Sequence, residues 1–187
     1  MKKQGFTLIE LLAVIVIMGI LMFAAIPAIN RTIENARKDQ FVDTAQNYAR
    51  AVETLWYADG LECKNGDGTS YQKASALPKS TGYCVDIDTT GATATAVELL
   101  QQGGKSPWGN KDVKGHVRIF CYDEEECAFS PFLYDGTHAI GTDDGFDYRD
   151  TDEINRGSVY TGEDANDAFQ AYGTCADTMI DYICRAI

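Results

Sequence analysis

The residue with the clearest chemical signature in this 187-residue sequence is Glu10, because it is the single carboxylate in an otherwise apolar run. The run extends from Leu8 to Ile29, and a membrane-spanning helix needs about 20 such residues. A charge at bilayer depth is unfavourable by roughly 2.5 kcal/mol or more, so an ionisable group there indicates a function. A buried carboxylate pairs strongly with a cation, and no basic residue lies one helical turn from Glu10. We therefore expect Glu10 to act in assembly.

The ends of the apolar run predict its orientation. Lys2 and Lys3 precede the run and indicate a cytoplasmic N-terminus, with the C-terminal bulk exported. A secretory signal would have a shorter apolar core followed by a small-residue cleavage site, and neither is found. The alternative is a plain N-terminal anchor in which Glu10 is merely tolerated near the interface, which the rarity of charges in such segments disfavours.

Cysteines form the second chemical signature, and all six follow the apolar run: Cys63, Cys84, Cys121, Cys127, Cys175 and Cys184. An even set in an exported domain predicts disulfides. Six cysteines allow 15 pairings, among which a sequence cannot choose. Proximity along the chain favours Cys63–Cys84, Cys121–Cys127 and Cys175–Cys184. Zinc is disfavoured, because the sequence has no C-x-x-C spacing and only two histidines.

An acidic run at residues 143–153 leaves two interpretations open. Its carboxylates could hold calcium, which takes six to eight oxygen ligands from flexible loops. The candidate ligands are Asp143, Asp144, Asp147, Asp150 and Asp152. Their spacing does not match the EF-hand pattern, and a solvated loop, which we favour, explains the same residues. Calcium is thus the one cofactor that stays open.

The sequence offers no catalytic motif. It lacks the serine-hydrolase, zinc-protease, phosphate-loop and dinucleotide signatures. His116 falls in a strand pattern and His138 lies beside a turn, and the missing partners favour structural roles for both. We predict that the chain is not an enzyme.

A long helix must position Glu10. Apolar residues continue beyond the membrane-length run near a 3.6-residue period: Ile26, Ile29, Ile33, Ala36, Phe41, Ala45, Tyr48, Val52 and Leu55. Residues 30–60 are therefore expected to be amphipathic and to dock on a globular head. Asp59-Gly60 predicts the end of the helix, with Gly60 as the left-handed residue. Gly19 and Pro27 weaken a helix by about 1 and 3 kcal/mol and predict a mild kink.

The head is expected to extend over residues 61–187. We predict a connecting region with little regular structure over 61–114 and an antiparallel sheet over 115–141, in which Pro131 marks an edge or bulge. Residues 142–187 are predicted to form the acidic loop and a C-terminal disulfide-bounded region, with short helices at 163–172 and 174–185. The fold class is α+β, a long helix packed on an antiparallel sheet.

Charge is distributed unevenly between the two parts. Residues 1–50 contain six basic and four acidic side chains, so the remainder carries a net charge of −14 within a chain of net charge −12. Affinity for nucleic acid depends heavily on Lys and Arg at phosphates. The acidic head therefore disfavours nucleic acid as a partner.

The segment Gly5-Phe6-Thr7-Leu8-Ile9-Glu10 resembles the class III signal of type IV prepilins and of the pseudopilins of type II secretion and competence. The resemblance implies a leader at residues 1–5 that prepilin peptidase removes between Gly5 and Phe6, followed by N-methylation of Phe6. It implies that residues 6–29 are first a transmembrane and then a filament-core helix. It also implies that Glu10 pairs with the Phe6 amine of a neighbouring subunit, and that the helix partly melts between Gly19 and Pro27 in the filament.

The implied protein is a subunit with the pilin fold that forms a type IV pilus-like homo-oligomeric filament. An inner-membrane assembly platform would transfer it from the cytoplasmic membrane to the cell surface. Ser106-Pro107-Trp108-Gly109 is similar to a Pro-Trp-Gly element of major pseudopilins, some of which bind calcium near the acidic run. A major pseudopilin and a minor tip pilin that acts as an adhesin are therefore the alternatives.

Overall fold

The structure of the chain is a computed structural model. It describes residues 7–65, 68, 70–78, 81–89, 105–109, 111–122, 126–141, 154–175 and 180–187. Contacts divide the chain into two compact units between Arg37 and Lys38, and each unit is described by itself.

The first unit is helical throughout its described part. Helix α1 (Leu8–Tyr57) begins in this unit and runs through both Gly19 and Pro27. Every large apolar side chain between Leu8 and Ile33 is at least 45% exposed. The expected apolar positions Ile26, Ile29 and Ile33 therefore do not belong to a core within this chain.

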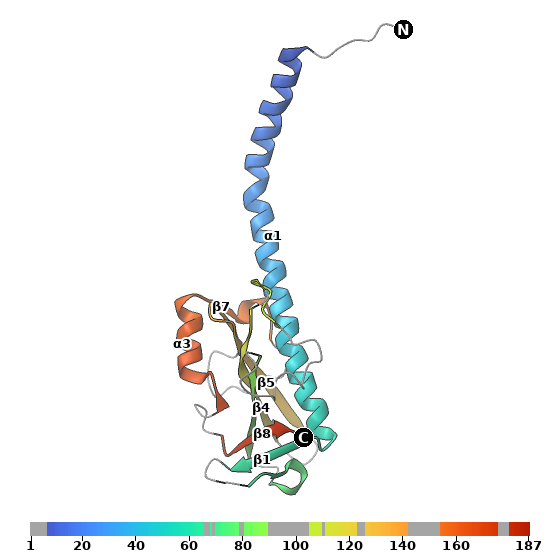
Figure 1. Ribbon diagram of the computed structural model, residues 1–187, viewed down its shortest axis with the longest axis vertical. Helices are drawn as coiled ribbons and strands as arrows, with labels where there is room; N and C mark the ends of the chain where they lie inside the picture. Colours follow the sequence, from blue (N-terminus) through green and yellow to red (C-terminus); the bar gives the residue numbers. More distant parts are fainter. Residues whose placement is uncertain are drawn as a thin grey trace, which may run out of the picture. The chain divides into compact units, whose positions relative to one another are not determined.

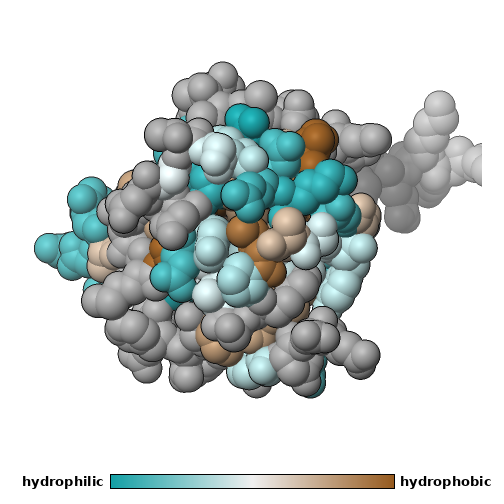
Figure 2. Space-filling view, turned by 90° about the horizontal axis from the view of Figure 1, so that it is seen from below, coloured by the Kyte–Doolittle hydropathy of each residue, from teal (hydrophilic) through white to brown (hydrophobic). Residues whose placement is uncertain are grey.

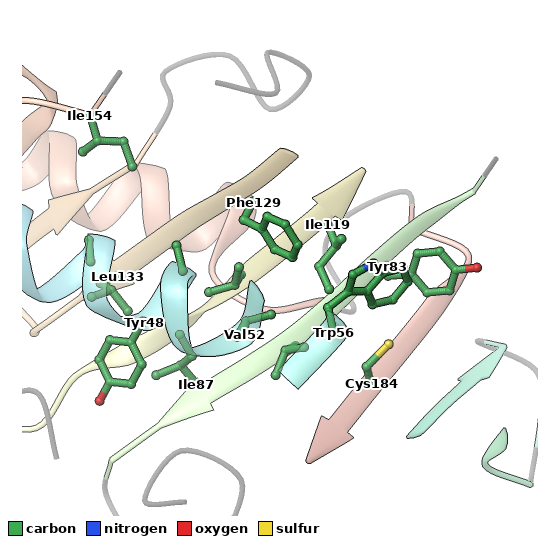
Figure 3. Packing of buried hydrophobic residues seen from close by; sticks show 14 of the residues in the cluster. Tyr48, Val52, Trp56, Tyr83, Ile87, Ile119, Phe129, Leu133, Ile154 and Cys184 are labelled. Atoms are coloured by element: carbon green, nitrogen blue, oxygen red, sulfur yellow. The ribbon is translucent and has the colours of Figure 1, made fainter. Parts of the chain in front are cut away.

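In the second unit, one face of α1 forms half of the core. The buried residues of the helix all lie between Phe41 and Trp56 and follow helical spacing: Phe41, Val42, Ala45, Tyr48, Ala49, Val52 and Trp56. Figure 3 shows Tyr48, Val52 and Trp56 directed at sheet residues that include Ile87, Ile119 and Leu133. The predicted amphipathic half-helix is present, and its apolar face is the one that the 3.6-residue period indicates.

The end of α1 differs from the prediction in one residue. Asp59 is the left-handed residue, with φ of 54°, and Gly60 is not. The N–H of Gly60 donates to the Leu55 carbonyl at 2.8 Å, and a Cβ on Gly60 would lie 2.9 Å from the Leu55 side chain. Asp tolerates this conformation better than most residues. Gly60 is thus favoured by close approach of the helix rather than by its φ.

The described residues of the head form an eight-stranded sheet in the order β2-β1-β8-β3-β4-β5-β6-β7. All neighbours pair antiparallel except β3 and β8, which are parallel. The strands are β1 (Leu61–Asn65), β2 (Gln72–Lys73), β3 (Gly82–Asp88), β4 (Lys114–Cys121), β5 (Cys127–Tyr134), β6 (His138–Ile140), β7 (Val159–Thr161) and β8 (Tyr182–Ala186). Short 3-10 turns lie at Ala74–Ala76 and Arg156–Ser158.

The hairpin strands predicted in 115–141 are β4, β5 and β6, but the sheet is larger than expected. The prediction of a connecting region at 61–114 is wrong for β1, β2 and β3, because turn residues concealed their short strand patterns. The prediction of a helix at 174–185 is wrong, because Tyr182–Ala186 form strand β8. Pro131 pairs with Val117 and lies in the part of β5 that β6 does not reach, which fits a residue without an N–H.

Helix α3 (Glu163–Tyr172) lies on the face of the sheet opposite α1, as Figure 1 shows. Phe132 and Ala139 of the sheet pack with Ala165 in a second, smaller cluster, which Phe169 borders. The helix predicted at 163–172 is therefore present, and the sheet is covered on both faces.

The head contains three disulfides, and two of them connect residues that lie far apart in the sequence. Cys63–Cys184 joins directly opposed residues of β1 and β8, and Cys84–Cys175 joins β3 to the turn after α3. The predicted pairings Cys63–Cys84 and Cys175–Cys184 are wrong. Proximity along the chain fails here because β8 returns to lie between β1 and β3.

The third disulfide follows the prediction. Cys121–Cys127 joins opposed residues of β4 and β5, with Cα atoms 3.9 Å apart, and clamps the base of their hairpin.

A buried carboxylate, Asp135, organises the β5–β6 turn. It accepts hydrogen bonds from the Ser106 hydroxyl, from the Thr137 N–H and hydroxyl at 2.8 and 3.0 Å, and from the His138 N–H at 2.7 Å. Burial raises the pKa of Asp135, but the hydrogen bonds from Ser106, His138 and Thr137 outweigh it and leave the pKa below its usual range. The carboxylate thereby ties segment 105–109 to the sheet.

The same segment carries Trp108, which contacts α1. The Trp108 ring stacks on His138 with 3.7 Å between ring centroids and meets Phe41 edge-on at 5.5 Å. The Pro-Trp-Gly segment thus acts as a structural element that links the β5–β6 turn to the long helix.

The described surface of the head is mostly polar. In Figure 2, which views the molecule from below, most of the coloured residues are hydrophilic or intermediate, and a few hydrophobic ones lie between them. The large apolar side chains that are exposed in the described head are Tyr57, Tyr122 and Ile187.

We expect the Cys63–Cys184 disulfide to contribute more to the free energy of unfolding than the Cys121–Cys127 disulfide of the β4–β5 hairpin. With Cys84–Cys175 in place, Cys63–Cys184 still closes a loop of about 30 residues, against six positions for Cys121–Cys127. Loop entropy then gives a loss of about 3–4 kcal/mol for the double Cys63→Ala, Cys184→Ala variant and about 2 kcal/mol for Cys121→Ala, Cys127→Ala. Denaturant unfolding of the full chain measures both, and equal losses would contradict the connectivity.

Asp135→Asn should destabilise the head by about 1–3 kcal/mol at neutral pH, because an amide cannot replace a carboxylate that accepts four bonds. The folded pKa is lowered, so the contribution of Asp135 is present above its unfolded pKa and is lost as pH falls through the folded value. Melting temperatures between pH 7 and pH 3 should fall less steeply for this variant than for the parent. The exposed Asp167→Asn is the matched control and should keep the parental slope.

Candidate assembly segment

Thr7 and Glu10 form a reciprocal cap at the start of α1. The Thr7 N–H and hydroxyl donate to Glu10 Oε2 at 2.9 and 2.8 Å, and the Glu10 N–H donates to Thr7 Oγ1 at 3.3 Å. This is a capping box, whose signature is Ser or Thr followed three residues later by Glu. The sequence-based interpretation of Glu10 missed it, although Thr7-x-x-Glu10 is legible in the sequence.

The cap leaves Glu10 able to bind a cation. Both bonds from Thr7 reach Oε2, and none of the residues that the structure describes donates a hydrogen bond to Oε1 or forms an ion pair with the side chain. A carboxylate has about four acceptor sites. Glu10 can therefore keep its cap and accept an ammonium group from another chain.

The helix surface around Glu10 is uniformly apolar. One 18-residue window of α1 has a mean hydropathy of 2.8 and no buried residue, so this helix is long and apolar enough to cross a membrane. A Cβ on Gly19 would meet nothing within 4 Å. Gly19 thus has no packing role within one chain, which leaves its surface for a neighbouring helix.

Several predicted site residues lie outside the described part of the chain. They are Gly5 and Phe6 of the expected processing site and all five acidic candidates for calcium: Asp143, Asp144, Asp147, Asp150 and Asp152. Within the described residues, no group of three His, Cys, Asp or Glu side chains could hold a metal ion.

The two histidines have structural positions. His116 is fully buried and stacks on Phe132, with 5.7 Å between ring centroids. His138 lies 3.4 Å from Asp135, but the Ser106 hydroxyl donates to Asp135 directly and not to His138. The three side chains therefore lack the Ser–His contact of a hydrolytic triad.

At the start of the second unit, Arg156 clamps α1 to the turn before β7. Its guanidinium donates to both carboxylate oxygens of Asp39, with Nε to Oδ1 at 2.7 Å. These bonds lower the pKa of Asp39 and raise that of Arg156. The Gln46 amide donates to the Ile154 carbonyl at 3.5 Å and extends the attachment.

Comparison with known proteins supports the features of the N-terminal segment. Residues 1–26 match the family described as the prokaryotic N-terminal methylation motif. The chain is also 31% identical over 125 residues to the type IV major pilin protein PilE of Neisseria gonorrhoeae, covering 64% of this chain and 74% of that protein. The chain belongs to the type IV pilin family.

No solved structure matches this pilin. The α+β architecture, a long N-terminal helix followed by an antiparallel-dominated sheet with three disulfides, agrees with the membership. The pilin is a single-pass membrane protein through its N-terminal helix, as the methylation motif and the apolar window together indicate.

Thr7→Ala should fray the first turn of α1 in the unprocessed pilin. It removes the hydroxyl, which is the N-cap acceptor and one of the two donors to Glu10, a loss of about 1 kcal/mol, while the backbone N–H at position 7 remains. Hydrogen exchange of the Glu10 and Leu11 amides in micelles should accelerate, while Thr32→Ala, in the middle of the helix, should leave them unchanged. Equal exchange in Thr7→Ala and the parent would show that the capping box does not form.

Proposed function

We propose that this pilin is a structural subunit of a type IV pilus-like filament, processed between Gly5 and Phe6 and assembled through α1. The observation that carries the proposal is the helix surface from Leu8 to Ile29, which is exposed, apolar and interrupted by one carboxylate. Such a surface needs lipid or other helices around it. The methylation motif and the similarity to a major pilin support packing against the helices of other subunits after export.

The chemistry of assembly follows from the position of Glu10. Lateral association of apolar helices in lipid gains little from the hydrophobic effect, since lipid tails are as apolar as leucine. An ion pair in a low-dielectric core supplies both attraction and axial register. Cleavage before Phe6 creates an ammonium group, and the Glu10 carboxylate of a neighbouring subunit is its complement. The subunit then acts by binding and not by catalysis.

Pilus and pseudopilus are distinguished by the length and abundance of the fibre. The similarity to a major pilin over 125 residues favours a pilus subunit. Electron microscopy of sheared surface filaments, followed by mass spectrometry of their main protein, tests this: abundant long fibres of this pilin are expected. Trace incorporation would indicate a minor tip subunit instead, and absence of fibres would indicate a pseudopilin.

Glu10→Ala should abolish filaments without removing the protein from the membrane. The variant keeps the apolar surface, but it lacks the partner of the Phe6 amine, so we expect filament yield to fall more than about tenfold. Sheared-filament yield is measured beside the intact mass of the membrane-bound form, which should correspond to a processed and methylated Phe6 terminus.

Asp43→Ala is the matched control, because it removes an exposed carboxylate from the same helix, and its filament yield should equal that of the parent. Normal filament yield in Glu10→Ala would refute the pairing. A leader still attached to the exported parent protein would refute the processing step.

A further inference from the structure

A hollow of 310 Å³ opens at the end of the sheet where β4 begins and β5 ends. The rings of Tyr134 and Phe169 line one part of it, stacked with their centroids 4.5 Å apart. The other lining residues are Asp112, Lys114, Asp135 and Gly136. A cavity of about 150 Å³ is enough to hold a benzene ring, so this hollow can accept an aromatic side chain.

The lining leaves room for such a ring. Gly136 adopts a φ of 94°, and a Cβ there would meet nothing within 4 Å. The Asp135 side chain is fully buried and is occupied by its four hydrogen bonds. A ligand would therefore meet mainly the two stacked rings, the glycine backbone and the exposed side chain of Lys114.

A matching side chain lies at the opposite end of β4. Tyr122 directly follows the strand and is 61% exposed. Its backbone N–H donates to the Glu126 carbonyl at 2.9 Å, and the adjacent Cys121–Cys127 bridge clamps the hairpin. Tyrosine is enriched among the residues that dominate protein interfaces, and a fixed backbone reduces the entropy lost on binding. Tyr122 is thus a preorganised aromatic contact residue.

Distance excludes a contact between Tyr122 and the hollow of the same chain. Strand β4 runs over eight residues from Lys114, which lines the hollow, to Cys121, which precedes Tyr122. At about 3.4 Å per residue, the two ends of the strand are roughly 25 Å apart. Only the hollow of a second copy is within reach of this side chain.

Helix α1 runs in the same direction as β4 through the head. Near the β5–β6 turn, Phe41 meets the ring of Trp108 with 5.5 Å between centroids. At the other end of the head, Tyr57 lies 6.2 Å from Phe129, which pairs near the end of β4. The hollow and Tyr122 are therefore displaced along the axis of this part of α1. Subunits whose α1 helices pack in parallel present these two surfaces to one another.

The charges around the two surfaces are complementary. The sequence that follows Tyr122 is Asp123-Glu124-Glu125-Glu126. At the other end, Lys105 pairs with Asp112 of the hollow, Lys111 Nζ donates to Thr137 Oγ1, and Lys114 lies 4.0 Å from Asp88. The Lys105 and Lys114 side chains are 39% and 52% exposed, and each ammonium group has three donors. In a strongly acidic head, these lysines favour the approach of an acidic turn.

We propose that Tyr122 of one subunit inserts into the hollow of a second copy displaced by about 25 Å along α1. The Tyr122 ring packs on Tyr134 and Phe169, and Lys114 faces the acidic turn. This contact rests on the proposed filament and goes beyond it, because it joins one head to another rather than helix to helix. An exposed side chain that fits a pocket elsewhere on the same molecule makes a contact that does not close, so it propagates along a fibre.

Photocrosslinking within filaments tests which surfaces meet. The full chain carrying Tyr122→p-benzoylphenylalanine is assembled in cells, and its sheared filaments are irradiated and analysed by mass spectrometry. We expect covalent dimers in which position 122 of one chain is joined to residues 133–136 or 166–170 of the other.

Substitutions test whether the contact stabilises the filament. Tyr122→Ser should lower the yield of filaments that survive shearing about fivefold, through loss of the aromatic contact. Lys114→Glu should also lower the yield, and adding Glu126→Lys should restore it, because the reversed charges can meet only between chains. Tyr122→Phe keeps the ring and should give the parental yield.

Ile187→Ser is the matched control, because it removes another exposed apolar side chain, 66% exposed, from the end of the head that carries Tyr122. Its yield should equal that of the parent. Melting temperatures and thiol counts in detergent verify that each variant is folded and oxidised.

Three results in a parent that forms filaments would overturn this proposal alone: crosslinks from position 122 that map elsewhere, equal yields from Tyr122→Ser and Ile187→Ser, or no restoration in the charge-reversed pair. A parent that forms no filaments would overturn the filament proposal and this contact together.

Discussion

The fold of the head depends on the placement of its last strand. In the described sheet, β1 and β3 do not pair with each other, and β8 lies between them with hydrogen bonds to both. The final residue extends this link, because the Ile187 N–H donates to the Gly60 carbonyl at the end of α1. The sheet is therefore complete only when the C-terminus has returned, and two disulfides fasten the chain on either side of that return.

Helix α1 has a different distribution of apolar side chains in each of the two units. Up to Ile29, the helix exposes apolar side chains all round, and its single carboxylate accepts hydrogen bonds from Thr7. From Phe41 onward, one face is buried against the sheet and the other is polar. A segment of the first kind stays in lipid or joins other helices, whereas a segment of the second kind carries a folded head. The apolar first part of α1 and its amphipathic second part are the physical basis for the proposed export followed by polymerisation.

Polar groups in the head serve mainly to hold segments together. Asp135 is buried but accepts four hydrogen bonds, and through Ser106 and His138 it positions Trp108 against Phe41. An unsatisfied carboxylate at that depth would be strongly unfavourable.

Local patterns predicted much of this architecture. The periodicity of Phe41, Ala45, Tyr48 and Val52 indicated the buried helix face, and the alternation in 115–134 indicated the β4–β5 hairpin with its Cys121–Cys127 bridge. These features depend on neighbours a few residues apart, which a sequence displays directly. The capping box was equally local and was legible in the sequence from its Thr and Glu spacing.

The sequence by itself determined the signal motif, the membrane-length helix, its amphipathic continuation and an even set of cysteines in an acidic head. Only the tertiary structure decided which cysteines meet, that residues 182–186 form a strand, and that Asp59 rather than Gly60 is left-handed. The reason is physical. A bridge or a β-ladder between residues some 120 positions apart depends on where the whole chain returns, and nothing in the local sequence encodes that distance.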